Sequence, residues 1–222
     1  MSKVMDPADG RKTPAKRRYN SARRAEQAAE TRRRIVAAAA ECFAERGYAR
    51  TTLAQIAERA EVSVESVAAN GPKRALILAA FEQSLAGEEG QQGTVERDFA
   101  APILALEDRE EFLEAAAEFA VTSASRAIGI WRAFSSAADD DEELAAVYRA
   151  LAGRRREDAR ALARILDSRG WLRPDATVEQ HADTLALLTG LDPYQLYVRD
   201  FGWTEDELRA WFVDTARRLL FA

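Results

Sequence analysis

The segment Thr31–Leu76 has the hydrophobic periodicity of several helices, each too short to be stable alone. Apolar side chains recur at spacings of three and four over residues 35–43, as on one face of a helix. Gly47 follows, and a glycine readily adopts the left-handed conformation that ends a helix. Because short helices persist only when they share buried surface, we expect this segment to form one small helical core.

The second and third predicted helices of this segment are separated by a tight turn. Thr52 begins the second helix and forms a capping box with Gln55. A turn at Glu61 leads to Ser63, a good N-cap for a very short third helix over residues 64–69. A glycine–proline pair then opens a longer helix. This order is typical of a helix-turn-helix DNA-binding domain.

The N-terminal domain of the TetR family of one-component bacterial regulators resembles this segment, which reads TRRRIVAAAAECFAERGYARTTLAQIAERAEVSVESVAANGPKRALI. The resemblance is specific over Thr31–Ser66. It implies an all-helical homodimer that binds double-stranded operator DNA, with the third helix in the major groove and a C-terminal domain that senses a small molecule. By position it also implies DNA contacts from Thr52, Ser63, Val64, Glu65, Ser66 and Lys73.

Three departures from the family pattern bear on DNA recognition. Glu61 occupies the place of the turn glycine, where a side chain at positive φ is strained by roughly 1 kcal/mol. Ala68 stands where the family has a tyrosine that contacts a phosphate, and Val67–Lys73 is one residue short and lacks an aromatic residue. These departures leave a second hypothesis open, a dimeric sensor or interaction module whose helix-turn-helix no longer reads DNA.

Positive charge is concentrated at the N-terminus, although the whole chain has a net charge of −5 at pH 7. Residues 1–34 hold eleven basic and four acidic side chains, which leaves a net charge of −12 for residues 35–222. Phosphate neutralisation supplies much of DNA affinity, so we expect residues 1–24 to be a disordered basic arm that contacts DNA. The alternative is a solvated tail without a partner. The arginines expected to contact DNA are Arg17, Arg18, Arg23, Arg24 and Arg32.

The rest of the chain predicts an all-α fold. The whole chain is 47% hydrophobic, which suffices for a proper core, and the apolar residues after the first domain never alternate as in strands. We expect a helix-turn-helix domain over residues 25–75 and a helical ligand-sensing and dimerisation domain over residues 76–222. The helices expected in the second domain span 100–106, 110–122, 125–137, 139–168, 177–190 and 204–219.

Aromatic residues concentrate in the middle helices of the predicted second domain. By position they resemble the lining of the family's inducer cavity, which would suit a small apolar or amphipathic effector. Plain core packing explains such a stripe equally well, and periodicity alone leaves both readings open. The residues concerned are Phe112, Phe119, Trp131, Phe134 and Tyr148.

Two late helices carry large apolar stripes, which the resemblance assigns to a four-helix dimer interface. The alternative is that these stripes only complete the core of one subunit. His181, the single histidine, is expected as a satisfied interface residue, and Arg154–Arg156 is expected on a solvated, ion-paired face. The predicted interface residues are Val178, His181, Leu185, Leu208, Trp211, Phe212 and Thr215.

Several classes of function lack support in the sequence. Cys42 is the single cysteine, so no internal disulfide is expected, and no spacing suggests a metal site or another cofactor. No glycine-rich phosphate loop or nucleophile–base pair predicts an enzyme. No apolar run reaches the roughly 18 residues of a membrane span, so the cytoplasm is the expected location. The leading hypothesis is a ligand-responsive transcriptional regulator, expected to be a repressor.

Overall fold

The computed structural model describes residues 14–87, 89–90 and 93–222, with side chains described from residue 23 onward. The described chain is all α, as predicted, and its one strand-like feature is an isolated bridge between Leu172 and Phe221. The elements are α1 (Pro14–Arg50), α2 (Leu53–Ala60), α3 (Val64–Ala69), α4 (Lys73–Ala86), the 3-10 turn η1 (Thr94–Glu96), α5 (Ala100–Leu104), α6 (Arg109–Asp140), α7 (Glu142–Ser168), α8 (Val178–Leu188), the π-helical turn η2 (Tyr194–Asp200) and α9 (Glu205–Leu219).

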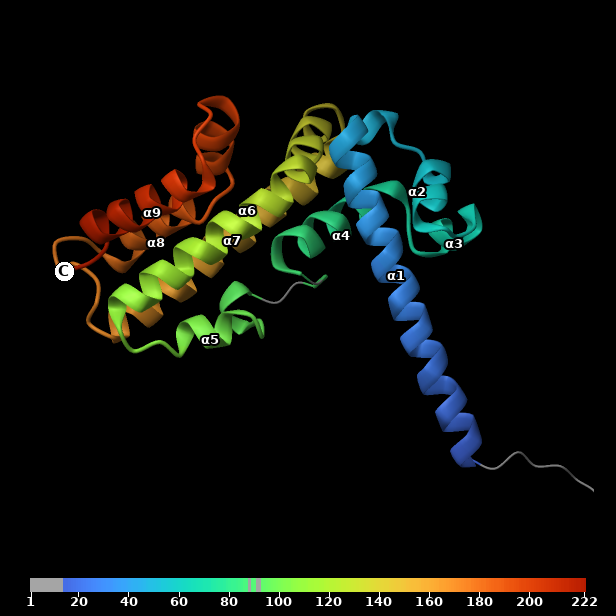
Figure 1. The fold of residues 1–222 in the computed structure, drawn as a ribbon, viewed down its shortest axis with the longest axis horizontal. Coiled ribbons are helices and arrows are strands. Elements are labelled where there is room, and N and C mark those ends of the chain that lie inside the picture. The colour runs from blue at the N-terminus through green and yellow to red at the C-terminus, as the bar shows by residue number, and fades with distance from the viewer. Residues whose placement is uncertain (1–13, 88, 91–92) are drawn as a thin grey trace, which may run out of the picture.

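The long helices α6 and α7 run side by side and form the axis of the molecule (Figure 1). Helices α1–α3 lie at one end of this axis, and α8 and α9 pack toward the other end, where the chain terminates (Figure 1). Helix α4 packs against both α1 and α6, and therefore links the N-terminal helices to the rest of the molecule.

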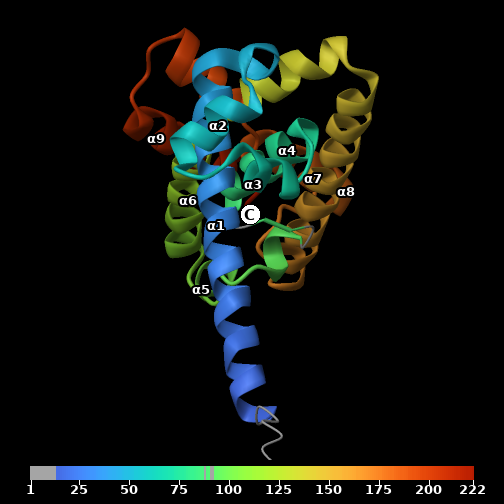
Figure 2. The same cartoon turned by 90° about the vertical axis from the view of Figure 1, so that its right-hand side faces the viewer.

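Helix α1 is longer than predicted. It begins at Pro14 and continues without a break past residue 24, so residues 14–24 are helical rather than disordered, while residues 1–13 lie outside the described part. Alanine, glutamate, glutamine and arginine, which favour helix, dominate residues 21–30. The N-terminal half of α1 extends away from the other helices in both Figure 1 and Figure 2, and residues 23–30 are exposed. It is therefore a projecting rod.

The break at Gly47 is confirmed, since its backbone has φ 77° and ψ 167° inside the span of α1. Tyr48 then folds back onto the helix, and its ring lies 5.7 Å from the ring of Phe43. The predicted capping box at Thr52 is present, as are the boxes at Thr177 and Thr204. Local sequence patterns therefore fix the start of α2, α8 and α9.

The middle of the chain corrects two predictions. The two helices expected over 110–122 and 125–137 are one helix, α6, since no helix-breaking residue separates them. Gly129 inside α6 allows close contact with α1, because a Cβ there would lie 3.0 Å from the Cβ of Ala44. Helix α7 begins at Glu142 rather than at residue 139, with Asp141 as its N-cap.

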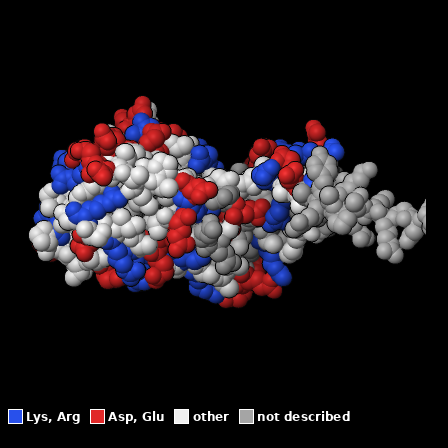
Figure 3. Space-filling view, turned by 90° about the horizontal axis from the view of Figure 1, so that it is seen from below, with Lys and Arg blue, Asp and Glu red and all other residues white. Residues whose placement is uncertain are grey.

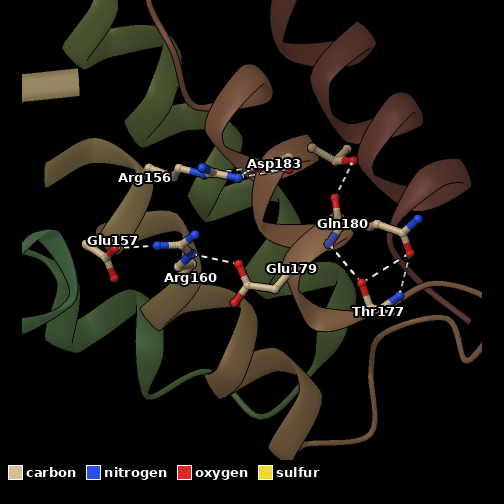
Figure 4. Close-up of polar contacts among 8 residues, drawn as sticks. Arg156, Glu157, Arg160, Thr177, Glu179, Gln180 and Asp183 are labelled. Carbon is tan, nitrogen blue, oxygen red and sulfur yellow. Dashed lines mark hydrogen bonds and ion pairs between the residues drawn. The ribbon is translucent and has the colours of Figure 1, made fainter. Parts of the chain in front are cut away.

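Buried side chains form two clusters. The first joins α1–α4 to the C-terminal half of α6 and the start of α7. A single core therefore continues across the domain boundary that was predicted at residue 75. The second cluster joins the start of α6 to α7, α8 and α9. Ion pairs fasten α8 to the outer face of α7: Arg160 pairs with Glu179 at 2.7 Å, and Arg156 with Asp183 at 3.1 Å (Figure 4).

Candidate functional site

The turn between α2 and α3 has the geometry of a helix-turn-helix motif. Glu61 ends α2 in the left-handed conformation, with φ 54° and ψ 47°, and no other described non-glycine residue has a positive φ. The Oγ of Ser63 then accepts a hydrogen bond from the backbone N–H of Ser66 at 3.1 Å and caps α3. The chain tolerates the strain of Glu61, roughly 1 kcal/mol, to keep this turn.

Helix α3 is regular despite its shortened exit toward α4. Val67 is fully buried and anchors α3 to the first core cluster. Ser63, Val64 and Glu65 are exposed, and Ser66 is half-buried. With α1 and α2, α3 lies on the face that Figure 2 turns toward the viewer. The residues predicted to face the major groove are therefore accessible to a partner.

The surface of α3 carries no positive charge, because residues 63–72 include neither lysine nor arginine. Hydrogen bonds from its own backbone N–H and from Ser63 lower the pKa of Glu65, so this carboxylate is ionised at neutral pH. Thr52, at the N-terminus of α2, is also exposed and uncharged. Phosphate neutralisation would therefore have to come from another element.

Two predicted phosphate contacts are engaged within the protein instead. The Nζ of Lys73 donates a hydrogen bond to the carbonyl of Thr51 at 2.9 Å and lies 4.2 Å from the ring centre of Tyr48. Burial lowers the pKa of Lys73. Arg32 donates a hydrogen bond to the carbonyl of Asn70 at 2.9 Å and forms an ion pair with Glu89. Both cations thus stabilise the N-terminal helices rather than face a phosphate.

Two of the arginines predicted to contact DNA, Arg23 and Arg24, are exposed on the projecting half of α1. The side chains of Arg17 and Arg18 lie outside the described part of the chain. Seen from below, the C-terminal body has acidic and basic side chains interspersed over its surface (Figure 3). On that face the body therefore lacks a large basic patch.

A cavity of about 160 Å³ lies among α4, the η1–α5 segment, α6, α7 and α8. Its lining is mainly apolar and includes the stacked rings of Phe99 and Phe119, 4.5 Å apart, and the ring of Phe112. Of the five predicted ligand-binding aromatics, Phe112 and Phe119 therefore line this cavity. The expectation of an apolar pocket among the middle helices agrees with its position.

The other three predicted ligand-binding residues form a separate aromatic cluster. Trp131 lies 5.2 Å from Phe81 and 5.0 Å from Tyr148, and Phe134 lies 5.9 Å from Tyr148, measured between ring centres. None of these rings lines the cavity. Trp131 and Phe134 are buried, so their assignment to a ligand site is corrected to core packing where α4, α6 and α7 meet, the alternative that periodicity left open. Tyr148 is half-buried and also lines a second hollow, among α1, α6 and α7.

Arg155 lines the cavity, which the sequence analysis missed. Arg154 and Arg156 form ion pairs as predicted, with Glu82 and Asp183, but Arg155 turns inward, with its guanidinium 5.6 Å from the ring centre of Trp131. Helical spacing contained the signal, because residue 155 is four positions from both Leu151 and Ala159, which are buried. Other polar residues of the lining are Thr94, Ser123, Asp158 and Thr189.

The predicted dimer residues of α8 and α9 lie mostly inside the subunit. His181, Leu185, Leu208 and Phe212 are buried in the two core clusters, and Val178, Trp211 and Thr215 are half-buried. The Nε2 of His181 lies 3.0 Å from the carbonyl of Arg173, so this histidine is satisfied within the subunit. The assignment of the buried stripes to an interface is therefore corrected to the core of one subunit.

Within residues 14–87, 89–90 and 93–222, no group of three or more histidine, cysteine, aspartate or glutamate side chains is arranged to hold a metal ion. No helix in this part of the chain has the length and apolar character needed to cross a membrane. Cys42 is buried on the inward face of α1, as predicted, and burial raises the pKa of its thiol.

This chain resembles known proteins both in the sequence of its N-terminal helices and in its overall fold. Residues 35–68 match the family described as "Bacterial regulatory proteins, tetR family". A TetR transcriptional regulator from Chloroflexus aurantiacus is 23% identical, with a TM-score of 0.62 over 89% of this chain and all of that one. A putative transcriptional regulator from Saccharomonospora viridis, in complex with choline, is 18% identical, with a TM-score of 0.64 over 87% of this chain and 99% of that one.

NalD of Pseudomonas aeruginosa, the secondary repressor of the MexAB-OprM multidrug efflux pump, is 20% identical, with a TM-score of 0.62 over 87% of this chain and 98% of that one. No curated protein sequence shows significant similarity to this chain. The helix-turn-helix and the all-helical body give this chain the fold of these regulators. The resemblance to the tetR family is confirmed by the match over residues 35–68 and by the shared fold.

Proposed function

We propose that this chain is a ligand-responsive DNA-binding transcriptional regulator that represses its target as a homodimer on a palindromic operator in the cytoplasm. The observation that carries the proposal is the regular helix α3, with Ser63, Val64 and Glu65 exposed behind the left-handed turn at Glu61. A rigid, accessible helix after such a turn is the element that enters the major groove. The role of NalD as a repressor supports the direction of the effect.

The direct test is a gel-shift assay of the full chain with duplex DNA from upstream of its own coding sequence. We expect a retarded band that competitor DNA of unrelated sequence does not remove. The second candidate, a sensor whose helix-turn-helix has lost its target, is favoured by Ala68 and by the absence of cations on α3. A folded, dimeric protein that shifts no upstream fragment even in dilute buffer would support that candidate and refute ours.

The proposed homodimer uses the outer faces of the late helices. Of the five large apolar side chains exposed in the described part of the chain, four lie between residues 187 and 219: Leu187, Leu196, Phe201 and Leu219. Apolar exposure concentrated in this part of the chain favours an interface between copies. We expect sedimentation equilibrium to give twice the mass of one chain, and Leu187→Glu to shift the equilibrium toward monomer. A monomer at all concentrations would contradict this assignment.

The response to ligand is proposed to pass through the segment between α4 and η1. Leu85 and Ala86 at the end of α4 and Thr94 at the start of η1 line the cavity, and Glu89 between these elements pairs with Arg32. Arg32 also holds the carbonyl of Asn70, the C-cap of α3. A ligand that displaces this segment would therefore change the support of the reading helix. The choline and triclosan complexes of two proteins with this fold support a small-molecule effector.

Glu89→Gln tests this route. The variant removes the ion pair but keeps the side-chain volume, so we expect a 3- to 10-fold change in affinity for upstream DNA without any ligand, equivalent to about 1 kcal/mol. Glu96→Gln removes an exposed carboxylate from the same region and should leave the affinity unchanged. Equal DNA affinities for wild type and Glu89→Gln, measured by fluorescence anisotropy, would exclude Arg32 and Glu89 from the route.

A further inference from the structure

The arginine run 154–156 on α7 divides between two environments. Arg154 pairs with Glu82 at 3.0 Å, and Arg156 pairs with Asp183 at 3.1 Å on the outer face. Figure 4 shows Arg156 reaching across to Asp183 on α8, next to the Arg160–Glu179 pair. Each of these arginines therefore has a carboxylate partner. Arg155, between them, turns to the cavity instead.

The guanidinium of Arg155 is held between a ring and a backbone. It lies 5.6 Å from the ring centre of Trp131, and one of its terminal nitrogens would be 2.8 Å from a Cβ at Gly190. The missing side chain at Gly190 thus makes room for this cation against the C-terminal end of α8. Among the described side chains no carboxylate forms an ion pair with Arg155, which is itself only half-exposed.

The carboxylate that lines the same cavity, Asp158, is engaged elsewhere. Its Oδ2 accepts a hydrogen bond from the hydroxyl of Thr94 at 2.7 Å, and its Oδ1 would lie 3.0 Å from a Cβ at Gly93. This carboxylate is therefore held against the segment before α5. The hydroxyl of Thr189 donates to the carbonyl of Leu185. Arg155 thus contributes to the cavity wall a half-exposed side chain whose guanidinium has no ion pair with a described carboxylate, an arrangement that favours an anionic ligand.

We propose that the cavity selects a small amphipathic anion, a carboxylate joined to an apolar group about the size of one ring, and that Arg155 binds the carboxylate. This inference rests on the proposed function, because it names the effector class of that cavity. The volume of about 160 Å³ sets the size, since apolar cavities of about 150 Å³ accommodate benzene. The stacked rings of Phe99 and Phe119 provide apolar surface for the ring of the ligand.

Three probes of one shape and different charge test the proposal: benzoate, benzamide and benzylamine. We expect isothermal titration calorimetry of the full chain to show benzoate bound at least about 10-fold tighter than benzamide, with benzylamine weakest, since a bidentate guanidinium–carboxylate contact is charge-assisted. Arg155→Gln should weaken benzoate binding at least about 10-fold and change benzamide binding less than about 2-fold. Arg156→Gln, the matched control, should leave both unchanged.

Several outcomes would overturn the assignment of Arg155. The first is that benzylamine binds most tightly, which would point to Asp158 as the ligand contact. The second is that Arg155→Gln loses affinity for benzoate and benzamide equally. The third is that no probe binds at about 10 mM. Circular dichroism and thermal melting confirm that each variant is folded. Binding of upstream DNA is measured without a probe, so the two tests are independent. If the chain binds benzoate selectively but shifts no upstream DNA, only the proposed function is refuted. Retarded DNA without benzoate selectivity refutes this inference alone.

Discussion

Phe134→Ala is expected to lower the free energy of unfolding by about 3–5 kcal/mol, the largest effect of any substitution considered for this chain. Phe134 is fully buried, and its ring lies 6.2 Å from Phe81, 6.3 Å from Trp131 and 5.9 Å from Tyr148. Removal of this ring leaves a cavity where α4, α6 and α7 meet. Urea denaturation followed by tryptophan fluorescence measures the loss.

Arg132→Ala provides the control on the same helix, since the side chain of Arg132 is exposed. We expect this substitution to cost less than about 1 kcal/mol. A similar loss of unfolding free energy in both variants would show that the aromatic cluster contributes no special stability to the core. Because the cluster lies beside α4, a loosened cluster in Phe134→Ala should also weaken the support of the N-terminal helices.

Deletion of residues 1–24 is expected to weaken binding to upstream DNA at least about 100-fold in dilute buffer and to flatten its salt dependence. The reason is the distribution of charge. Residues 63–72 have no cation, and Lys73 and Arg32 are engaged within the protein. The deleted segment holds eight basic side chains and two acidic ones. Each phosphate contact that is lost reduces the slope of log affinity against log salt by about 0.9.

Fluorescence anisotropy at several salt concentrations measures both quantities. Arg218→Gln, which removes an exposed cation at the far end of the chain, should change neither the affinity nor the slope. An unchanged salt slope after deletion of residues 1–24 would exclude the N-terminal arm from the DNA contact. That result would instead support the alternative that the N-terminal arm is a solvated tail without a partner.

The parts of the fold that depend on neighbouring residues were predictable from the sequence. The capping boxes at Thr52, Thr177 and Thr204 each involve residues three positions apart, and all three are present. The cap at Ser63 follows from the same local chemistry, whereas the left-handed conformation of Glu61 was expected from the family resemblance, which has a glycine at this position. The helix-turn-helix was therefore predictable in detail.

The parts that depend on distant residues were not predictable. The stripes of α8 and α9 were correctly identified as buried, but periodicity could not decide whether the same subunit or a second copy covers Leu185 and Phe212. Trp131 is equally apolar whether it faces a ligand or Phe81. Arg155 was grouped with its charged neighbours, although its helical position placed it between Leu151 and Ala159. Such assignments require the packing of elements that are remote in sequence.

The η2 turn was missed because its residues lack a clear period. Tyr197 within it stacks on Trp203 at 4.4 Å and lies 4.8 Å from Trp211, so the segment is held by aromatic contacts. Phe201 at its end is exposed and belongs to the proposed interface between copies. A π-helical turn leaves no simple signal in the sequence, since its hydrogen bonds join residues five positions apart.

If α3 reads a DNA sequence, the protein must bind one duplex far more tightly than another of the same composition, and the ratio of these two affinities is the decisive measurement. Fluorescence anisotropy at physiological salt compares the upstream duplex that is retarded in gels with a scrambled duplex of the same length and composition. We expect the full chain to bind the upstream duplex at least about 1,000-fold more tightly. Equal affinity for the two duplexes would show that only the basic N-terminus contacts DNA and that α3 does not read a sequence.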